Sequence, residues 1–228
     1  MSPDPVRVAV YYAPLPDDPL FAESATWLGR DPESGAPAPQ PDIAGLAEVT
    51  VEPRQYGFHA TLKPPMRLRS GKSWDEFRDA ADELASGIAA FALPPLTVAN
   101  VHGFLALREA EPSQHLQALA DLCVAALDEF RATPSEAEFA RRRRAGLSAA
   151  QDAMLRRWGY PYVFGTWFFH MTLTRRLNAE ERSRYQPAAE HHFARALLEM
   201  RRVTEICLFT QASAEAPFLL AERLKLRG

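Results

Sequence analysis

Apolar residues recur at intervals of three and four along several stretches of this chain, which is the spacing of one face of an α-helix. The clearest stretch follows Ser73, which with Glu76 makes a capping-box signature, and its apolar stripe continues to Phe91. The same spacing, mostly with capping residues at the starts, predicts further helices at about 19–28, 113–130, 135–144, 148–158 and from 178 to 200.

Other stretches are rich in β-branched and aromatic residues and are bounded by turn-forming residues, which predicts strands. They lie at about 6–13, 58–63, 96–101, 104–108, 169–174, 203–210 and 218–226. Pro64 and Pro65 are expected to end the second of these strands, because proline cannot donate a ladder hydrogen bond. Residues 31–42 are rich in proline and are expected to form a surface connection.

The predicted elements repeat along the chain. A strand, a helix and two strands occur at about 57–108 and again at about 167–226, and residues 109–166 form a mostly helical connection between them. We therefore expect two pseudo-symmetric lobes within a single domain that spans residues 1–228. In this arrangement the leading strands of the two repeats face each other across a cleft.

Both leading strands carry the same motif, Phe-His-x-Thr-Leu, at 58–62 and 169–173. Because side chains alternate between the two faces of a strand, the His and the Thr of each motif share one face. This face is expected to present three polar side chains from each strand: His59, Thr61 and Lys63 from the first, and His170, Thr172 and Thr174 from the second. One His-x-Thr triplet is weak evidence, whereas two matched copies indicate a site.

Paired imidazoles suit a displacement at phosphorus, because near neutral pH one histidine can act as a base while its partner holds a proton. One histidine activates water, and the other protonates the departing oxygen. Thr61 and Thr172 are expected to donate hydrogen bonds to phosphoryl oxygens, and Lys63 to offset the developing negative charge. No serine or cysteine nucleophile with a partnering base shows a recognisable motif, so a covalent mechanism is not expected.

A metal centre is the main chemical alternative for two histidines. The motifs have no Asp, Glu or Cys beside them, whereas a catalytic zinc usually needs three protein ligands. His191 and His192 are adjacent on a helix and project in different directions. We therefore expect neither a metal nor another cofactor.

Composition narrows the range of partners. The chain has 228 residues, of which 47% are apolar and 24% charged, and its net charge of −3 argues against long nucleic acid as the main partner. Cys123 and Cys207 lie in apolar periodic segments and are expected to be buried thiols. No signal peptide or membrane-spanning run is recognised, so a cytoplasmic protein without membrane contact is expected, and its oligomeric state is left open.

The paired motifs resemble those of the 2H phosphoesterase superfamily, which is named for two such histidines. The resemblance covers nearly the whole chain and is most specific for a branch associated with phosphonate-utilisation operons, the DUF1045-like phosphonate metabolism proteins. It rests on four stretches: 27–31 (Trp-Leu-Gly-Arg-Asp), 56–65 (Tyr-Gly-Phe-His-Ala-Thr-Leu-Lys-Pro-Pro), 158–163 (Trp-Gly-Tyr-Pro-Tyr-Val) and 169–174 (Phe-His-Met-Thr-Leu-Thr). Residues 164–167 depart from the more acidic stretch expected there.

This resemblance implies a bilobal α+β fold, with two antiparallel sheets flanked by helices around a central cleft. It implies a phosphoric diester hydrolase that needs no metal and opens a small cyclic ribose phosphate, such as 5-phosphoribosyl 1,2-cyclic phosphate. The motif residues His59, Thr61, His170 and Thr172 are then the catalytic groups. Further substrate-binding candidates are Lys63, Thr174, Tyr11, Arg30, Tyr56 and Arg176, although the aromatic ones suit packing between the lobes equally well.

Two alternatives to this function remain. An RNA-end 2′,3′-cyclic phosphodiesterase uses the same histidines, although RNA favours a broad basic surface that this composition does not show. A non-catalytic phosphate- or nucleotide-binding accessory protein keeps the pocket without turnover, although the intact pair of motifs favours catalysis. Arg141 to Arg144 either guard the entrance for an anionic substrate or form a solvated face at a helix end.

Overall fold

The computed structural model describes residues 5–144 and 146–228 of the chain. Its helices are α1 (Pro19–Leu28), α2 (Leu46–Val49), α3 (Val51–Tyr56), α4 (Trp74–Ser86), α5 (Gln114–Ala126), α6 (Glu136–Arg143), α7 (Ala149–Trp158) and α8 (Ala179–Phe193), with 3₁₀ turns η1 (Asp128–Phe130), η2 (Phe164–Thr166) and η3 (Ala196–Leu198). Its strands are β1 (Arg7–Tyr12), β2 (Ala60–Met66), β3 (Phe91–Leu93), β4 (Leu96–Val101), β5 (Phe104–Glu109), β6 (Met171–Arg176), β7 (Arg201–Val203), β8 (Glu205–Gln211) and β9 (Leu219–Lys225).

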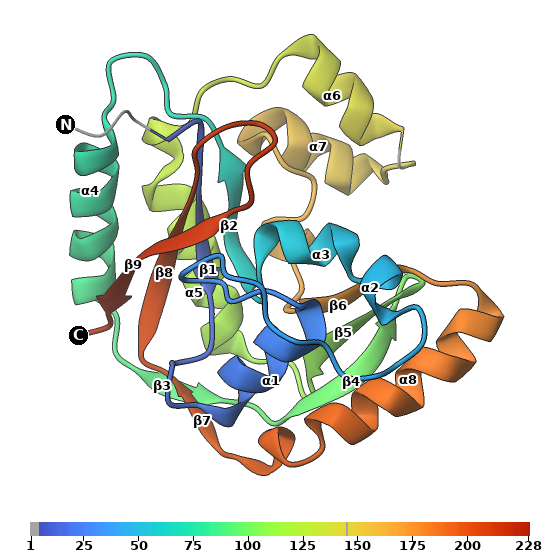
Figure 1. Cartoon of the computed structure of the whole chain (residues 1–228). Helices are drawn as coiled ribbons and strands as arrows, with labels where there is room; N and C mark the ends of the chain where they lie inside the picture. The colour runs from blue at the N-terminus through green and yellow to red at the C-terminus, as the bar shows by residue number, and fades with distance from the viewer. Residues whose placement is uncertain (1–4, 145) are drawn as a thin grey trace.

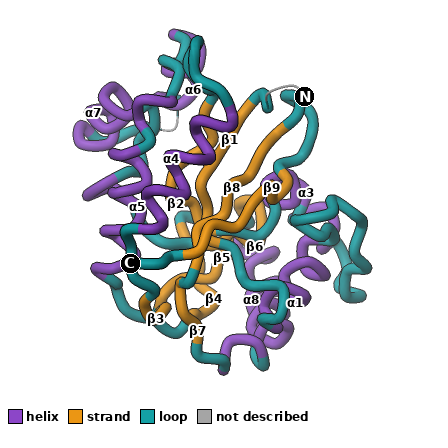
Figure 2. The backbone as a smooth tube through the Cα atoms, turned by 90° about the vertical axis from the view of Figure 1, so that its left-hand side faces the viewer, coloured by secondary structure: helices purple, strands orange, loops and turns teal. Residues whose placement is uncertain are grey.

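Within these described residues, seven strands form one antiparallel sheet in the order β4-β5-β6-β2-β1-β8-β9, and β3 pairs with β7 in a separate ribbon. The strands run through the middle of the molecule, with α4 and α5 on one side and α1 and α8 on the other (Figure 2). Figure 1 shows α6 and α7 together at the end of the molecule opposite α8. The predicted α+β class, with two antiparallel sheets and flanking helices, is confirmed.

The element order β2–α4–β3–β4–β5 recurs as β6–α8–β7–β8–β9, and the two copies exchange hairpins. The β4–β5 hairpin pairs with β6, the leading strand of the other copy, while the β8–β9 hairpin joins β2 through β1. In the same way α4 packs on β8 and β9, and α8 packs on β4. The helix of each copy therefore packs against strands that belong to the other copy.

Several boundaries differ from the sequence prediction. Pro64 and Pro65 lie inside β2 rather than beyond its end, where shifts in the β1–β2 register accommodate residues that have no N–H. The long amphipathic helix α4 ends at Ser86, and Phe91 begins β3 instead of continuing that helix. Helix α8 ends at Phe193 instead of continuing to about residue 200, and the short helices α2 and α3 were not predicted.

Alternation along β1 decides which of its side chains reach the cleft. Val10 and Tyr12 join the main core beneath the helices, whereas Tyr11 lies on the other face of the sheet with Phe209 and Phe218. The two cysteines are buried and unbridged, as predicted. The strand that precedes both repeats thus supplies an aromatic side chain to the face that carries the motifs.

Candidate active site

Each candidate histidine occupies the position immediately before a leading strand, His59 before β2 and His170 before β6. Nδ1 of His59 lies 2.9 Å from the carbonyl oxygen of Gly57, and Nδ1 of His170 lies 3.1 Å from that of Phe168. Because a carbonyl oxygen can only accept, both Nδ1 atoms carry a hydrogen. Both Nε2 atoms are therefore available for proton transfer.

Gly57 has a backbone conformation that glycine alone adopts readily, with φ at 75° and ψ at 175°. A Cβ at this position would lie 3.2 Å from Cβ of Pro32 and 3.3 Å from Nη2 of Arg30. With this conformation the Gly57 carbonyl receives the hydrogen bond from His59. The glycine in the Tyr-Gly-Phe-His segment thus orients the first imidazole through the backbone.

The register of the leading strands brings the two motifs together. β2 and β6 run antiparallel and pair at Ala60 and Met171. One position away from this pair, His59 therefore lies opposite Thr172, and His170 lies opposite Thr61. Ala60 and Met171 point into the core, which places the histidines and threonines on the opposite face. His59 and Thr172 line one cavity of about 170 Å³. The Thr61 hydroxyl lies 3.3 Å from Nε2 of His59.

Tryptophan side chains satisfy backbone carbonyls where β2 and β6 no longer pair. Nε1 of Trp167 donates to the carbonyl of Thr61 at 2.8 Å, and Nε1 of Trp27 donates to the carbonyl of Leu173 at 3.1 Å. A buried carbonyl without a partner is costly, so these indoles allow the two strands to separate.

Both imidazoles are held in the neutral form. Burial lowers the pKa of His59 to about 4, an effect that the hydrogen bond to Gly57 opposes and that electrostatic repulsion between protonated His59 and His170 strengthens. Burial also lowers the pKa of His170, and the charges of Arg108 and His102 lower it further against its own backbone hydrogen bond. In the free protein both histidines are therefore mainly neutral at pH 7.

Tyr11 and Tyr56, both expected to bind substrate, lie beside His59. The Tyr11 ring stacks on the imidazole with 3.7 Å between ring centroids and is fully buried. The Tyr56 ring lies 6.3 Å from the same imidazole, is 38% exposed and lines the cavity. Tyr11 therefore packs on one face of the imidazole, and Tyr56 is accessible to a ligand.

Arg108 is a residue near the histidines that the sequence analysis did not single out. Leu105 and Leu107 of β5 face the core, so strand alternation places Arg108 on the cleft face. Its guanidinium lies 5.5 Å from the ring centroid of Phe168, and that ring lies 4.6 Å from the ring of His170. Its Nε is buried without a partner among the described residues. Strand alternation gives the face on which Arg108 lies, but only the pairing of β5 with β6 shows that this face adjoins His170.

Lys63 does not face the histidines, contrary to the sequence prediction. A shift in the β1–β2 register sets Lys63 opposite Val10, which belongs to the core face, and so turns the ammonium toward the helices. Its Nζ donates to the carbonyl of Val124 at 3.1 Å and lies 4.0 Å from the carboxylate of Asp128. Burial lowers the pKa of Lys63 to about 8. Lys63 thus fastens α5 to the sheet.

The remaining substrate-binding candidates have other partners. Thr174 lines the cavity, but it is 1% exposed and its hydroxyl accepts a hydrogen bond from the backbone of β5. Arg176 is exposed at the last position of β6. Arg30 is buried and donates to the carbonyls of Arg54 and Phe218 at 2.8 and 3.0 Å. Arg30 therefore joins α3 to the start of β9 instead of lining the cavity.

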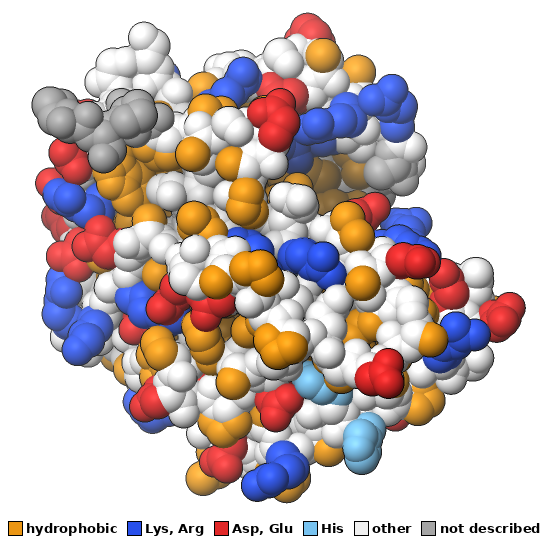
Figure 3. Space-filling view, viewed as in Figure 1, with side chains coloured by type: hydrophobic (Ala, Val, Ile, Leu, Met, Phe, Trp, Pro, Cys, Tyr) orange, Lys and Arg blue, Asp and Glu red, His pale blue; other side chains and the backbone are white. Residues whose placement is uncertain are grey.

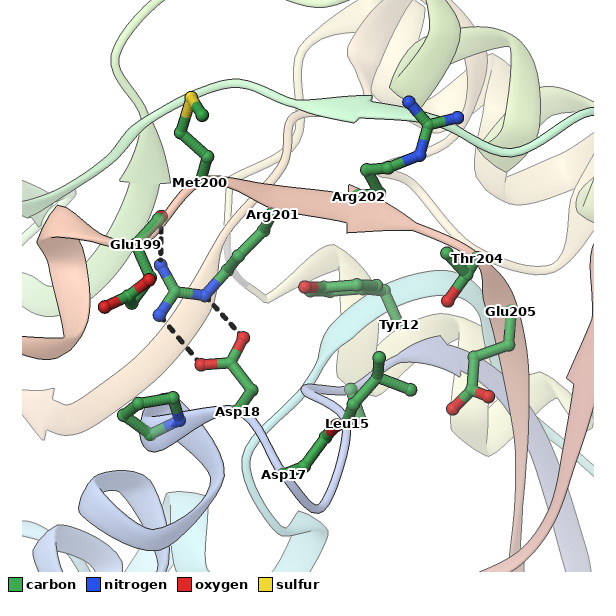
Figure 4. Close-up of a pocket in the computed structure, with 12 residues that line it drawn as sticks. Tyr12, Leu15, Asp17, Asp18, Glu199, Met200, Arg201, Arg202, Thr204 and Glu205 are labelled. Carbon is green, nitrogen blue, oxygen red and sulfur yellow. Dashed lines mark hydrogen bonds and ion pairs between the residues drawn. The ribbon is translucent and has the colours of Figure 1, made fainter.

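A larger cavity of about 390 Å³ lies elsewhere, where the start of α1 meets β7 (Figure 4). Asp18 caps α1 and accepts from Arg201, whose Nε lies 2.6 Å from Oδ2. Tyr12, Thr204 and Glu205 also face this cavity (Figure 4), but neither motif histidine lines it. Of the two cavities, only the smaller one is lined by a motif histidine, His59.

No group of three His, Cys, Asp or Glu side chains in residues 5–144 and 146–228 is arranged to hold a metal ion. Nε2 of His192 lies 2.8 Å from the carbonyl oxygen of Glu23.

In the same described part of the chain, no helix has both the length and the apolar character needed to cross a bilayer.

Comparison with protein families gives one matching model, described as "Protein of unknown function (DUF1045)", over residues 61–219. Two similar curated proteins are both called "Ribose 1,5-bisphosphate phosphokinase PhnN". The one from Janthinobacterium sp. (strain Marseille) is 37% identical, over 97% of this chain and 51% of that protein. The one from Laribacter hongkongensis (strain HLHK9) is 35% identical, over 94% and 50%. This chain thus spans about half the length of these relatives.

Similar solved structures include E. coli LigT complexed with 3′-AMP, which is 15% identical with a TM-score of 0.46. A structure described as a phosphoesterase is 16% identical with a TM-score of 0.44. Both alignments cover 99% of this chain and 100% of the other.

Proposed function

This chain belongs to the DUF1045 family, as its motifs indicated, and from its site we propose that it is a cyclic phosphodiesterase that needs no metal. The substrate is a small cyclic ribose phosphate, 5-phosphoribosyl 1,2-cyclic phosphate, whose ring is opened by water. The strand register carries this proposal, because it sets each motif histidine opposite the threonine of the other motif on one face of the sheet.

His59 is the general base in this proposal, and His170 is the general acid. The pKa of about 4 leaves Nε2 of His59 unprotonated, and the Thr61 hydroxyl can donate to that nitrogen. Nε2 takes a proton from water as the water oxygen bonds to phosphorus. A bound phosphodiester anion raises the pKa of His170, so this imidazole holds the proton that passes to the departing ring oxygen.

Arg108 and Thr172 stabilise the charge that develops on the phosphoryl oxygens. Thr172 lines the same cavity as His59, and in this proposal its hydroxyl donates to a phosphoryl oxygen. The unpartnered Nε of Arg108 supplies a charged donor on the side of His170. Arg108 therefore takes the role that the sequence analysis gave to Lys63.

The name of the two relatives supports a ribose phosphate as the substrate. Water that breaks the bond between phosphorus and the 2-oxygen leaves the phosphate on the 1-oxygen, and the 2-oxygen takes the proton. With a 5-phosphate already present, this product is ribose 1,5-bisphosphate, the compound in the name of these relatives. We propose that the same bond is broken here.

The kinase activity in that name is not proposed for this chain. A phosphate-binding loop of the common nucleotide-binding kind has the pattern G-x-x-x-x-G-K-S/T. Gly71, Lys72 and Ser73 match its end, but Met66 stands at the first glycine position. Nζ of Lys72 lies 2.6 Å from the carboxylate of Glu129, and Ser73 caps α4. These residues favour a structural role for this segment.

The test follows a panel of cyclic phosphates by phosphorus NMR with purified protein. We expect ribose 1,2-cyclic phosphate 5-phosphate to give a new phosphomonoester signal, with a higher kcat/KM than an oligonucleotide that ends in a 2′,3′-cyclic phosphate. A higher kcat/KM for the oligonucleotide, falling steeply with salt, favours the RNA-end function. Binding without turnover of any member of the panel favours an accessory protein.

A further inference from the structure

Glu52 lines the cavity of about 170 Å³ that contains His59 and Thr172. Among the described residues that line this cavity, it is the one charged side chain. Glu52 and Tyr56 are four positions apart on α3, so both side chains project from the same face of this helix. Helix α3 packs on β6, the strand that carries Thr172. The same packing therefore places Glu52 beside the second motif.

The Glu52 carboxylate is exposed and is not engaged by another side chain. It accepts no hydrogen bond and forms no ion pair with another residue that the structure describes. Arg175 on β6 is paired with Glu181, where Nη2 of the arginine lies 2.8 Å from Oε1. A carboxylate that is ionised can only accept hydrogen bonds. Glu52 therefore offers the cavity acceptor atoms that a donor on a ligand can use.

The charges near Glu52 do not suit the reacting phosphate, because a phosphodiester anion has acceptor oxygens only and is repelled by a carboxylate. Glu52 and Tyr56 also line an adjoining cavity of about 360 Å³, where one guanidinium, that of Arg7, is accompanied by a second carboxylate, that of Glu215. Figure 3 shows the surface hollowed between α7 and α3, with basic side chains gathered over α6 and α7. A neutral hydrogen-bond donor therefore suits the side of the site that α3 forms.

The sugar of the proposed substrate has one hydroxyl group. In ribose 1,2-cyclic phosphate 5-phosphate, the cyclic ester takes the oxygens on C1 and C2, the oxygen on C4 closes the furanose ring, and the oxygen on C5 carries the second phosphate. The 3-hydroxyl is thus the only sugar hydroxyl that can donate. The last ribose of an RNA that ends in a 2′,3′-cyclic phosphate has no free hydroxyl, because its 2- and 3-oxygens are esterified and its 5-oxygen joins the chain.

We infer that Glu52 determines specificity by accepting a hydrogen bond from the 3-hydroxyl of the ribose. The inference rests on the proposed function and deepens it, because it names the group by which a 1,2-cyclic phosphate is distinguished. A site that hydrogen-bonds a substrate hydroxyl discriminates against an analogue that lacks it. An RNA end brings no such donor to Glu52, and it brings further phosphates that the carboxylate repels.

The test compares ribose 1,2-cyclic phosphate 5-phosphate with its 3-deoxy analogue. We expect wild type to favour the compound with the hydroxyl by about 10- to 100-fold in kcat/KM, the usual range for a hydrogen bond to a charged group. In Glu52→Ala the preference should fall to about threefold or less, because the acceptor is gone. Glu48→Ala is the matched control, since Glu48 is an exposed glutamate on α2 that does not line this cavity. Thermal melting checks that each variant is folded, because a carboxylate in the first turn also stabilises its helix.

Equal kcat/KM values for the two compounds in wild type overturn the role of Glu52, and so does a preference that folded Glu52→Ala retains. Neither result affects the proposed hydrolysis, which wild type then still performs. If neither compound is hydrolysed, the proposed reaction fails, and calorimetric titration of the same two compounds decides the contact. Tighter binding of the ribose compound by wild type that is lost in Glu52→Ala supports it. Equal binding of the two compounds by wild type, or no binding of either, overturns it.

Discussion

The rings of Tyr11 and His59 are stacked, with centroids 3.7 Å apart and an angle of 21° between their planes. Tyr11 pairs with Thr61 across the β1–β2 ladder, so the strand that precedes both repeats supplies this support. The imidazole of His59 is thus fixed by a ring on its face and by the carbonyl of Gly57 at Nδ1. This leaves Nε2 as the atom that can accept a proton from water.

Replacing either histidine should reduce turnover without unfolding the protein. We expect His59→Ala and His170→Ala each to lower kcat by about 10²–10⁴-fold on the true substrate, the usual contribution of a general acid or base. The exposed His191→Ala is a control for the loss of an imidazole as such. Activity of either motif variant within a few-fold of wild type would rule out the two-histidine mechanism.

Replacing Arg108 by methionine should reduce kcat/KM by about 10²-fold, because a charged donor near the reacting phosphate is lost. The Arg108 charge lowers the pKa of His170 in addition to burial, so its removal should raise that pKa. NMR titration of the imidazole in R108M and in wild type measures this change. An unaltered His170 titration together with unaltered kinetics would remove Arg108 from the site.

Acid should destabilise the protein through His59. Its folded pKa of about 4 lies below the ordinary value of 6.5, so between these values the unfolded chain binds more protons than the folded protein. This contribution to stability is complete above pH 6.5 and is lost as pH falls toward 4. Chemical denaturation should therefore show that the free energy of unfolding falls more between pH 7 and pH 5 in wild type than in His59→Gln. Equal losses in the two proteins would show that His59 titrates normally.

Turnover should survive exhaustive chelation. The proposed chemistry uses the two imidazoles and places no step on a metal. Activity is measured after dialysis against a chelator, and again after addition of zinc or manganese. If chelation abolishes activity and either metal restores it, a metal mechanism is favoured. A third protein ligand for the metal, in addition to the two histidines, would then have to be found.

Changing Lys63 should leave catalysis nearly unchanged and should not destabilise the protein. Its folded pKa of about 8 lies below the ordinary 10.5, so burial of the charge costs stability in full below pH 8, and this cost is relieved as pH rises toward 10.5. We expect Lys63→Met to keep kcat/KM within about threefold of wild type and to be neutral or stabilising at pH 7. Asp128 retains Arg131 at 2.7 Å in this variant. A large loss of kcat/KM with normal stability would return Lys63 to the site.

Signals between residues that are close in sequence were sufficient to predict most helices and strands. Ser73 and Ser148 cap their helices as predicted, because a capping box involves neighbouring residues only. The same signals gave the wrong secondary structure where pairing with a strand distant in sequence determines it. Phe91 fits the helical spacing of α4, yet it pairs with Val203 in a ribbon that joins the two copies. Residues next to each other in sequence cannot report such a pairing.

For the candidate site, the sequence alone determined the four motif residues and their shared face, because alternation along a strand is a local property. The tertiary structure decided how the two motifs meet, through a single pair between Ala60 and Met171. It also turned Lys63 away through a shift in register, and it brought Arg108 near His170 by pairing β5 of the first copy with β6 of the second. Register and strand order depend on contacts between distant segments, so the motif pattern does not contain them.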